Sequence, residues 1–201
     1  MSTAHPLSTE IAATAARMVV EEGLEYGPAK KRAQRQLGLP RQVPMPSNDE
    51  LEDEVRSYLA LFCADTQPAE LRALRELAAG WMARLAEFRP HLCGAVWRGT
   101  ATRLSNIHLQ LFCDDSKSAE IALINMNVDY EVGEVAGPRG PVDCLAFAAP
   151  CKGLNESVTV CLTILDYDDQ RGALKPDARG RTERGDLAAL QRLLSSDEAA
   201  S

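Results

Sequence analysis

One stretch decides the fold, and it runs from Leu92 to Leu109 with the sequence LCGAVWRGTATRLSNIHL. A short apolar run ends at Gly94, and a second glycine, Gly99, follows an arginine. A loop rich in hydroxyl groups then leads into S-x-I-x-L, where apolar and polar residues alternate as in a half-buried strand. The stretch therefore predicts a strand, a glycine-containing loop and a second strand.

The chain changes character next to this stretch, near Arg89-Pro90. Apolar residues recur at helical spacing before it, and strand-type runs alternate with turn residues after it. Capping residues, prolines and periodicity predict helices at 8–22, 28–38, 48–62, 68–88, 116–125 and 186–194. The expected strands are 92–97, 107–113, 130–135, 142–148 and 158–165. Together they predict an α+β fold in which N-terminal helices pack on a small mixed β-sheet.

The same patterns predict three regions within one compact unit. We expect a helical region at 1–89, a sheet core at 90–167 and a polar tail with a short helix at 168–201. The helix at 68–88 is the longest and most periodic, and we expect it to pack on the sheet.

Charge and hydropathy exclude several classes of protein. The 201 residues carry a formal net charge of −7, which disfavours a protein that binds nucleic acid through charge alone. One expected helix is locally basic and would present either a solvated face or a contact to phosphates, through Lys30, Lys31, Arg32 and Arg35. The apolar run 11–20 is too short for a membrane span and contains Arg17, so no membrane partner is expected.

Six cysteines lie mostly inside apolar runs and none is part of a CxxC pair. With only three histidines, no zinc-ligand framework is present in the sequence. Small buried thiols in a reducing cytoplasm are the expected interpretation.

The stretch from 92 to 109 resembles the core motif of the polymerase-β-type nucleotidyltransferases. That motif has an apolar residue, Gly, then Gly or Ser, a spacer of about nine to thirteen residues, and two acids that flank an apolar residue in a strand. In this chain Gly94-Ala95 is followed by ten residues, 96–105, and then by Asn106-Ile107-His108. The resemblance covers 92–165 and implies a sheet of the nucleotidyltransferase type.

Both acids of the motif are replaced here, by Asn106 and His108. The family's third acid lies on a later strand, and the position that matches it is Cys161, with Thr159 and Thr163 as the other candidates on the same face. The acids of the family hold two divalent cations, whereas amide and imidazole groups bind Mg²⁺ weakly. The resemblance therefore implies no metal site, no certain cofactor, and at most a nucleotide bound with weak or no Mg²⁺.

The glycine loop keeps groups that bind phosphate even though Ala95 replaces the usual serine. Backbone N–H, hydroxyl and guanidinium donors would serve this role. The candidate binding residues are Gly94, Ala95, Arg98, Gly99, Thr100, Arg103 and Ser105. Trp97 is either a core aromatic or a platform for a base.

The expected function is a nucleotidyltransferase-like protein without two-metal transfer that binds a nucleotide or a protein partner. One alternative is an active transferase whose metal is held by other acids, namely Asp114, Asp129, Glu131 and Asp143. Another is an enzyme of unrelated chemistry on a similar sheet. Simpler interpretations stand beside these: Asn106 and His108 as polar residues of a strand face, Asp114 and Asp115 as helix caps, and Asp166, Asp168 and Asp169 as a solvated turn.

Overall fold

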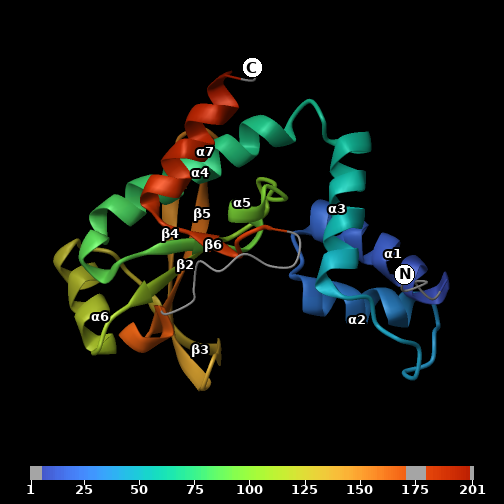
Figure 1. Cartoon of the computed structure of the whole chain (residues 1–201), viewed down its shortest axis with the longest axis horizontal. Coiled ribbons are helices and arrows are strands. Elements are labelled where there is room, and N and C mark those ends of the chain that lie inside the picture. Colours follow the sequence, from blue (N-terminus) through green and yellow to red (C-terminus); the bar gives the residue numbers. More distant parts are fainter. Residues whose placement is uncertain (1–5, 171–179, 200–201) are drawn as a thin grey trace. The chain divides into compact units, whose positions relative to one another are not determined.

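The computed structural model describes residues 6–170 and 180–199 (Figure 1). The chain divides into two compact units. A helical unit contains Met1–Pro68 with Thr100–Leu104, and a sheet unit contains Ala69–Gly99 with Ser105–Ser201. The division at residue 68 precedes the change of sequence character near Arg89, because the long helix between them belongs to the sheet unit.

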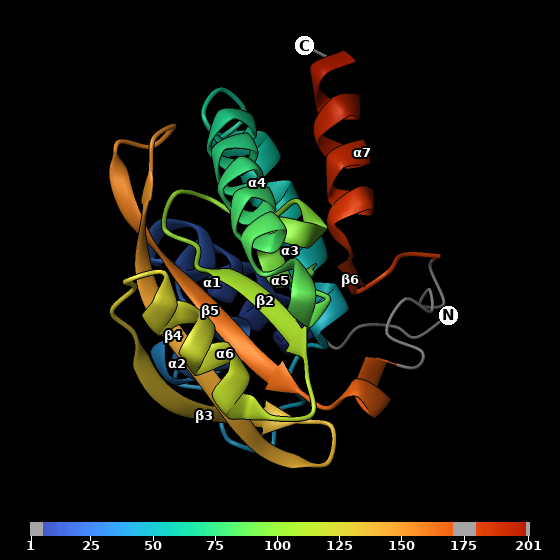
Figure 2. The same cartoon turned by 90° about the vertical axis from the view of Figure 1, so that its left-hand side faces the viewer.

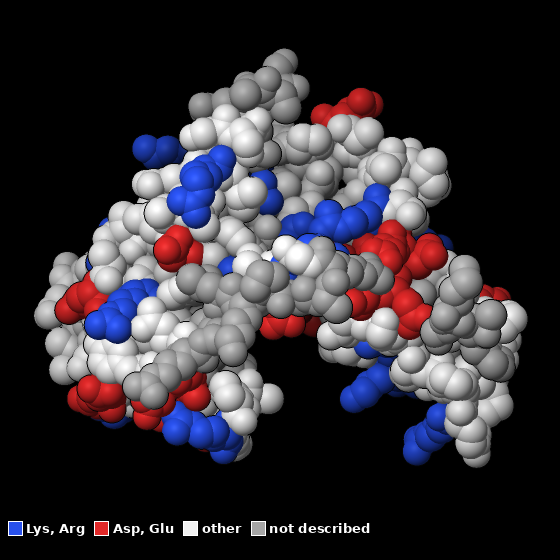
Figure 3. Space-filling model, viewed as in Figure 1, with Lys and Arg blue, Asp and Glu red and all other residues white. Residues whose placement is uncertain are grey.

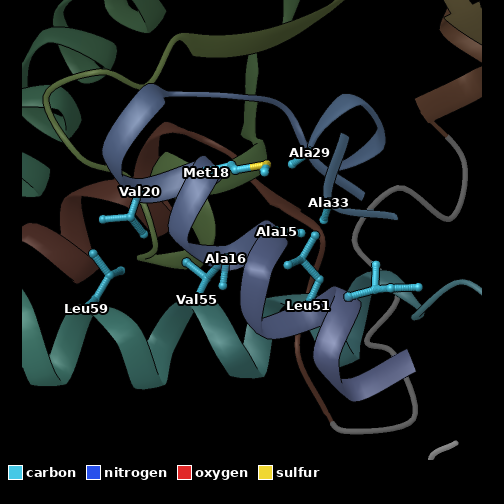
Figure 4. Packing of buried hydrophobic residues seen from close by; sticks show 10 residues of the cluster. Ala15, Ala16, Met18, Val20, Ala29, Ala33, Leu51, Val55 and Leu59 are labelled. Carbon is cyan, nitrogen blue, oxygen red and sulfur yellow. The ribbon is translucent and has the colours of Figure 1, made fainter. Parts of the chain in front are cut away.

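The helical unit is built from α1 (Pro6–Glu22), α2 (Tyr26–Gln36) and α3 (Asn48–Phe62). A capping box starts α3, in which the Ser47 hydroxyl accepts from the Glu50 N–H and the Glu50 carboxylate accepts from the Ser47 N–H. Small and branched apolar side chains from the three helices interlock in one cluster (Figure 4): Ile11, Ala15, Ala16, Met18, Val20, Ala29, Ala33, Leu51, Val55 and Leu59. The helices predicted from capping and periodicity are confirmed here.

The sheet unit contains six strands in the order β3-β4-β5-β2-β1-β6. The strands are β1 (His91–Cys93), β2 (Ile107–Phe112), β3 (Glu131–Gly137), β4 (Gly140–Cys151), β5 (Glu156–Leu165) and β6 (Arg184–Gly185). Figure 2 shows β2 and β5 side by side and pointing the same way, and they are parallel, whereas the other pairs are antiparallel. The sheet is therefore mixed and the α+β class is confirmed.

Helices cover one face of this sheet, which we call the covered face. The ring of Trp81 on α4 (Gln67–Arg84) contacts Phe147 of β4 edge-on, with centroids 4.5 Å apart. Farther along the same face, the Cys151 thiol donates to the Ala73 carbonyl of α4 at 3.8 Å. The charge of Asp143 on β4 contributes to raising the pKa of Lys117 on α6 (Ser116–Asn125), so this helix lies near the same face. The expected packing of the long helix on the sheet is thus confirmed.

Alternate strand residues point to the opposite face, which we call the polar face. At one end it carries a small apolar cluster of Phe112 and Leu165, against which Val142 and Tyr167 pack. Tyr167 belongs to a short 3-10 turn, η2 (Tyr167–Gln170). Away from this cluster the polar face carries sulfur, imidazole, amide and hydroxyl groups, as described below.

Several predicted boundaries are wrong. The strand expected at 92–97 ends at Cys93, because Gly94 has φ +70° and the chain turns there into a short helix, α5 (Gly94–Arg98). The long helix ends at Arg84 and is followed by a 3-10 turn, η1 (Ala86–Phe88). The region predicted as a polar tail contains the short strand β6 and ends in α7 (Leu187–Ala199). Residues 171–179 of this region lie outside the described residues.

Candidate functional site

A row of side chains crosses the polar face through the positions that the motif singled out. His108 of β2 lies in register with Cys161 of β5. Residues in register share a face of the sheet, so the second motif position and the predicted third one are neighbours. The row continues in both directions, and in order it reads Arg184, Cys93, His108, Cys161, Ala146 and Glu131.

A second row lies two residues farther along the strands. Gln110 is in register with Thr163, and Thr163 with Cys144. The Arg184 guanidinium donates to the Gln110 side-chain carbonyl and so links the two rows. The polar face therefore carries a guanidinium, an imidazole and three thiols within two rows of strand residues.

Gly94 brings the start of α5 against this face. A Cβ atom built on Gly94 would lie 3.5 Å from Cδ2 of the His108 ring. The backbone here has φ +70°, a region that glycine adopts without strain. Glycine thus allows the turn into α5 beside the imidazole, and the structure brings together the glycine and the second motif position.

Arg75 holds the other end of α5 in place. This α4 side chain is buried, with 6% exposure, and its Nε donates to the Val96 carbonyl at 3.2 Å. A second guanidinium nitrogen, Nη2, donates to the Trp97 carbonyl at 3.3 Å. These carbonyls lie in the last turn of α5, where no further helical N–H follows to bind them. Arg75 is therefore a positioning residue for the glycine loop.

The predicted phosphate-binding residues are divided between the two units. Gly94, Ala95, Arg98, Gly99 and Ser105 belong to the sheet unit, and Thr100 and Arg103 to the helical unit. Thr100 is buried, with 2% exposure, whereas Arg103 is exposed. Within the helical unit the Ala101 carbonyl accepts from the Gln67 amide at 2.9 Å. The seven residues thus do not form one local loop within a single unit.

Trp97 packs inside the sheet unit. Its indole N–H donates to the Thr182 carbonyl at 2.7 Å. Gly185 of β6 lies so close to the ring that a Cβ there would fall 2.1 Å from Cη2 of Trp97. These contacts fit the interpretation of Trp97 as a packing residue better than a role as a base platform.

Of the four alternative acids, Asp129 and Glu131 line the same cavity, described below, whereas Asp114 and Asp143 lie elsewhere. Asp143 lies in register with Glu134 and points to the covered face. Glu131 lies in register with Ala146 on the polar face. Asp114 is exposed beyond the end of β2. Within 6–170 and 180–199, no three His, Cys, Asp or Glu side chains are placed to hold a metal ion. Asp115 caps α6, since its carboxylate accepts from the Lys117 N–H at 3.0 Å, which confirms the capping interpretation for this residue.

A cavity of about 360 Å³ opens beside Ala146 and continues the first row beyond Cys161. Its lining combines two carboxylates with a phenol, a hydroxyl and apolar groups. The lining residues are Asp129, Tyr130, Glu131, Ala146, Phe147, Ala148 and Thr159.

The thiol of Cys144 differs from an ordinary cysteine. A hydrogen bond with the Cys161 side chain lowers the pKa of Cys144 to about 7, and the charge of His108 acts in the same direction against burial. Burial instead raises the pKa of Cys113, and the nearby carboxylates of Asp115 and Asp114 add to this effect. Proximity to a cation and a hydrogen-bond donor favours the thiolate.

Several surface charges in each unit are held by ion pairs or hydrogen bonds. Figure 3 shows acidic and basic side chains interspersed on the visible face. In the expected basic helix, Lys30 donates to Asn48 at 2.8 Å and Arg32 pairs with Glu22 at 2.6 Å. In the sheet unit Arg139 bridges the Asp166 and Asp169 carboxylates of the expected solvated turn. No helix within the described part of the chain is long and apolar enough to cross a membrane.

Sequence reasoning missed three residues of the polar face. Gln110 could have been predicted from the sequence, because alternation from His108 puts it on the same face of the strand. Cys144 required the register of β4 with β5, which no local pattern specifies. Arg184 carried no signal, because β6 has only two residues and follows a polar segment.

Neither a protein-family model nor a curated protein matches this sequence. Among solved structures, a crystal structure of the Cid1 poly(U) polymerase with MgGTP bound aligns with 54% of this chain at 12% identity and a TM-score of 0.36. The alignment covers 38% of that chain, so this protein spans less than half the length of the polymerase it is similar to.

Proposed function

We propose that this chain is a nucleotidyltransferase-like protein that binds a nucleotide on its polar face and does not catalyse two-metal nucleotidyl transfer. One observation carries the proposal. Gly94, His108 and Cys161, the residues that the resemblance assigns to motif positions, meet on one face, and none of the three is a carboxylate.

The residue types at the motif positions support the absence of two-metal transfer. Two divalent cations that bridge a triphosphate need hard oxygen ligands from several carboxylates. At these positions Asn106 supplies a neutral amide, His108 an imidazole and Cys161 a thiol, which suit softer ions. The remaining carboxylate in the row, Glu131, is separated from His108 by β5 and β4.

The order of residues in the row supports nucleotide binding. Arg184 and the backbone of Gly94 stand at the β1 end and would bind phosphates. The cavity of about 360 Å³ stands at the β4 end, where its carboxylates would accept hydrogen bonds from ribose hydroxyl or base amino groups. The three strand spacings from β1 to β4 add up to about 14 Å, a span that a nucleoside triphosphate covers.

Calorimetric titration of the whole protein with each nucleoside triphosphate, with Mg²⁺ and with a chelator, tests this proposal. We expect binding of at least one nucleotide that persists in the chelator. Arg184→Gln should weaken it by about tenfold or more, since a charge-assisted hydrogen bond is worth roughly 1.5–3 kcal/mol. Arg72→Gln is the matched control, because Arg72 pairs with Glu76 on the surface of α4.

Two results would overturn the proposal in different ways. No heat and no thermal stabilisation with any nucleotide would remove the binding function. Transfer of radiolabel from a nucleoside triphosphate to protein, RNA or a small acceptor would show that catalysis is retained.

A second candidate function, a protein-interaction module, is favoured by exposed apolar groups. Ile121 and Ile124 of α6 are 55% and 58% exposed, and Val132 of β3 is 61% exposed. Within the described residues β3 is also an edge strand of the sheet, and an edge strand can pair with a further strand. Sedimentation equilibrium tests self-association: this candidate expects a dimer that Val132→Ser weakens, and a monomer at all concentrations would contradict pairing between copies.

A further inference from the structure

A second cavity of the sheet unit lies beside the start of β1 and takes no part in the proposed nucleotide binding. Its volume is about 330 Å³, which is within the range of small-molecule pockets. It shares no residue with the motif positions or with the cavity beside Ala146. The described residues that line it come from α4, η1, β1, η2 and the start of α7. This cavity therefore needs an explanation of its own.

Part of the lining is apolar. Met82 belongs to the last turn of α4, Pro90 precedes β1, and Leu187 begins α7. Met82 and Pro90 are buried, and Leu187 is half-buried. An aliphatic group of a ligand would gain free energy by leaving water for such a wall.

Two opposite charges also line this cavity, and neither is neutralised by an ion pair. The Arg89 guanidinium donates to the Gln170 side-chain carbonyl at 3.1 Å. The Asp186 carboxylate accepts from the Ala189 N–H at 2.8 Å and so caps α7. In the part of the chain that the structure describes, neither Arg89 nor Asp186 forms a salt bridge. A separate cation and anion on one cavity match a ligand that carries both charges.

Arg89 is held in position before any ligand arrives. Its φ of +48° lies in the left-handed region, which residues other than glycine adopt rarely. Its N–H closes η1 by donating to the Ala86 carbonyl at 3.1 Å. The guanidinium lies 4.9 Å from the centre of the Tyr167 ring, a cation–π contact, in addition to its bond with Gln170. A side chain that is already ordered loses less entropy when it binds a ligand.

His91 adds a hydrogen-bond acceptor to the same cavity. The residue is 4% exposed, and Nδ1 lies 2.9 Å from the Arg89 carbonyl oxygen. A carbonyl can only accept, so Nδ1 carries the proton, and Nε2 of the neutral ring then presents a lone pair. No described residue makes a hydrogen bond with Nε2. The cavity thus has a buried acceptor whose partner is missing.

α7 begins at this cavity and supplies donors. The Asp186 carboxylate binds the Ala189 N–H, and the Asp186 carbonyl binds that of Leu190 at 3.0 Å. The N–H groups of Leu187 and Ala188 precede the first hydrogen bond within the helix. The positive end of the helix dipole favours a carboxylate at this place.

We propose that this cavity binds a free aliphatic amino acid as a zwitterion. The Arg89 guanidinium and the first N–H groups of α7 bind its carboxylate. The Asp186 carboxylate and Nε2 of His91 accept hydrogen bonds from its ammonium group, and the apolar wall binds its side chain. The inference needs no nucleotide, so it stands or falls separately from the proposed nucleotide binding.

Thermal unfolding and calorimetry of the whole protein with L-leucine, L-isoleucine, L-valine and L-methionine test the proposal. We expect at least one of them to bind and to raise Tm. The N-acetyl derivative of that amino acid lacks the ammonium charge, and its methyl ester lacks the carboxylate. Each should bind about tenfold more weakly or worse, because a charge-assisted hydrogen bond is lost. Glycine keeps both charges without a side chain and should also bind more weakly.

Variants locate the binding in this cavity. Arg89→Gln and Asp186→Asn each remove one charge and should each weaken binding by about tenfold or more. Asparagine still caps a helix, so α7 should be retained in Asp186→Asn. The matched controls are Arg84→Gln and Glu87→Gln, which remove neighbouring charges outside the lining and should bind like the wild type. Circular dichroism checks that every variant is folded.

The proposal fails on any of three results. One is the absence of heat and of a rise in Tm with all four amino acids. Another uses the wild type alone: equal affinity for an amino acid, its methyl ester and its N-acetyl derivative would show that the two charges of the ligand are not recognised. The third is wild-type affinity in both Arg89→Gln and Asp186→Asn, which would place the binding elsewhere.

Discussion

The two faces of the sheet are made by the same strands yet differ in chemistry. On the covered face, β2 and β5 present Leu109, Leu111, Val160 and Leu162, all buried beneath the helices. On the polar face, the intervening residues are His108, Gln110, Cys161 and Thr163, all half-buried. The period of two in a strand thus separates an apolar, buried face from a polar, half-buried face. The comparison predicts that substitutions on the two faces have different consequences.

The largest expected effect is on the covered face. Phe147→Ala should lower the free energy of unfolding by about 3–5 kcal/mol, because it removes a buried ring that packs on Trp81 and leaves a cavity. Its exposed strand neighbour on the polar face gives the control, and Ala148→Ser should change stability by less than about 0.5 kcal/mol. Urea unfolding measures both. Equal losses of unfolding free energy would contradict the difference in packing between the two faces.

The second prediction puts carboxylates back on the polar face. Asn106→Asp, His108→Asp and Cys161→Asp together should create a divalent-ion site, because His108 and Cys161 are adjacent in register. We expect calorimetry to show that Mn²⁺ binds with a Kd below about 1 mM, which corresponds to a binding free energy of at least about 4 kcal/mol. Asn125→Asp with Asn127→Asp adds charge beyond the face and should gain no such site. Failure of the triple variant to bind Mn²⁺ would count against the assignment of the motif positions.

How much of this could be read from the sequence differs between the two faces as well. The covered face follows from local alternation, which is why strands such as 107–113 and 158–165 were expected close to their observed bounds. Alternation also put Cys161 and Thr163 on one face. The neighbours of those residues depend on which strands pair and in what register, and that is set by packing between segments far apart in the chain. Cys144 and Arg184 therefore remained hidden.

The start of α5 shows another limit of the sequence. The run LCGAVW has strand-like composition, and only the φ of +70° at Gly94 makes it a turn into a helix. The helix is then held by Arg75, a buried cation on α4 whose hydrogen bonds to α5 no spacing rule anticipates. Here tertiary contacts override local propensity.

The third prediction tests that turn. Gly94→Ala should destabilise the protein by roughly 1–2 kcal/mol, because an L-residue is strained at a φ of +70°. Gly80→Ala is the matched control, since Gly80 lies in α4 with open space around it, and it should stabilise by about 0.5–1 kcal/mol. Thermal unfolding of both variants measures the difference. An equal response would mean that the turn is not constrained.

The smallest effect concerns the thiols and distinguishes the polar face by its titration. The thiolate is the nucleophile, so alkylation of Cys144 should rise with pH about a midpoint near 7, the pKa that Cys161 and His108 impose. From pH 6 to pH 8 the rate should grow by about tenfold, as the thiolate fraction does. His108→Gln removes the imidazole whose charge lowers the pKa of Cys144, so it should move the midpoint upward. Cys113, whose pKa is raised by burial, should keep its alkaline midpoint. Rates by mass spectrometry at each site measure this. A midpoint in the His108→Gln variant that is unchanged from the wild type would show that the imidazole does not act on the pair, and would leave the Cys161 hydrogen bond as the cause of the lowered pKa.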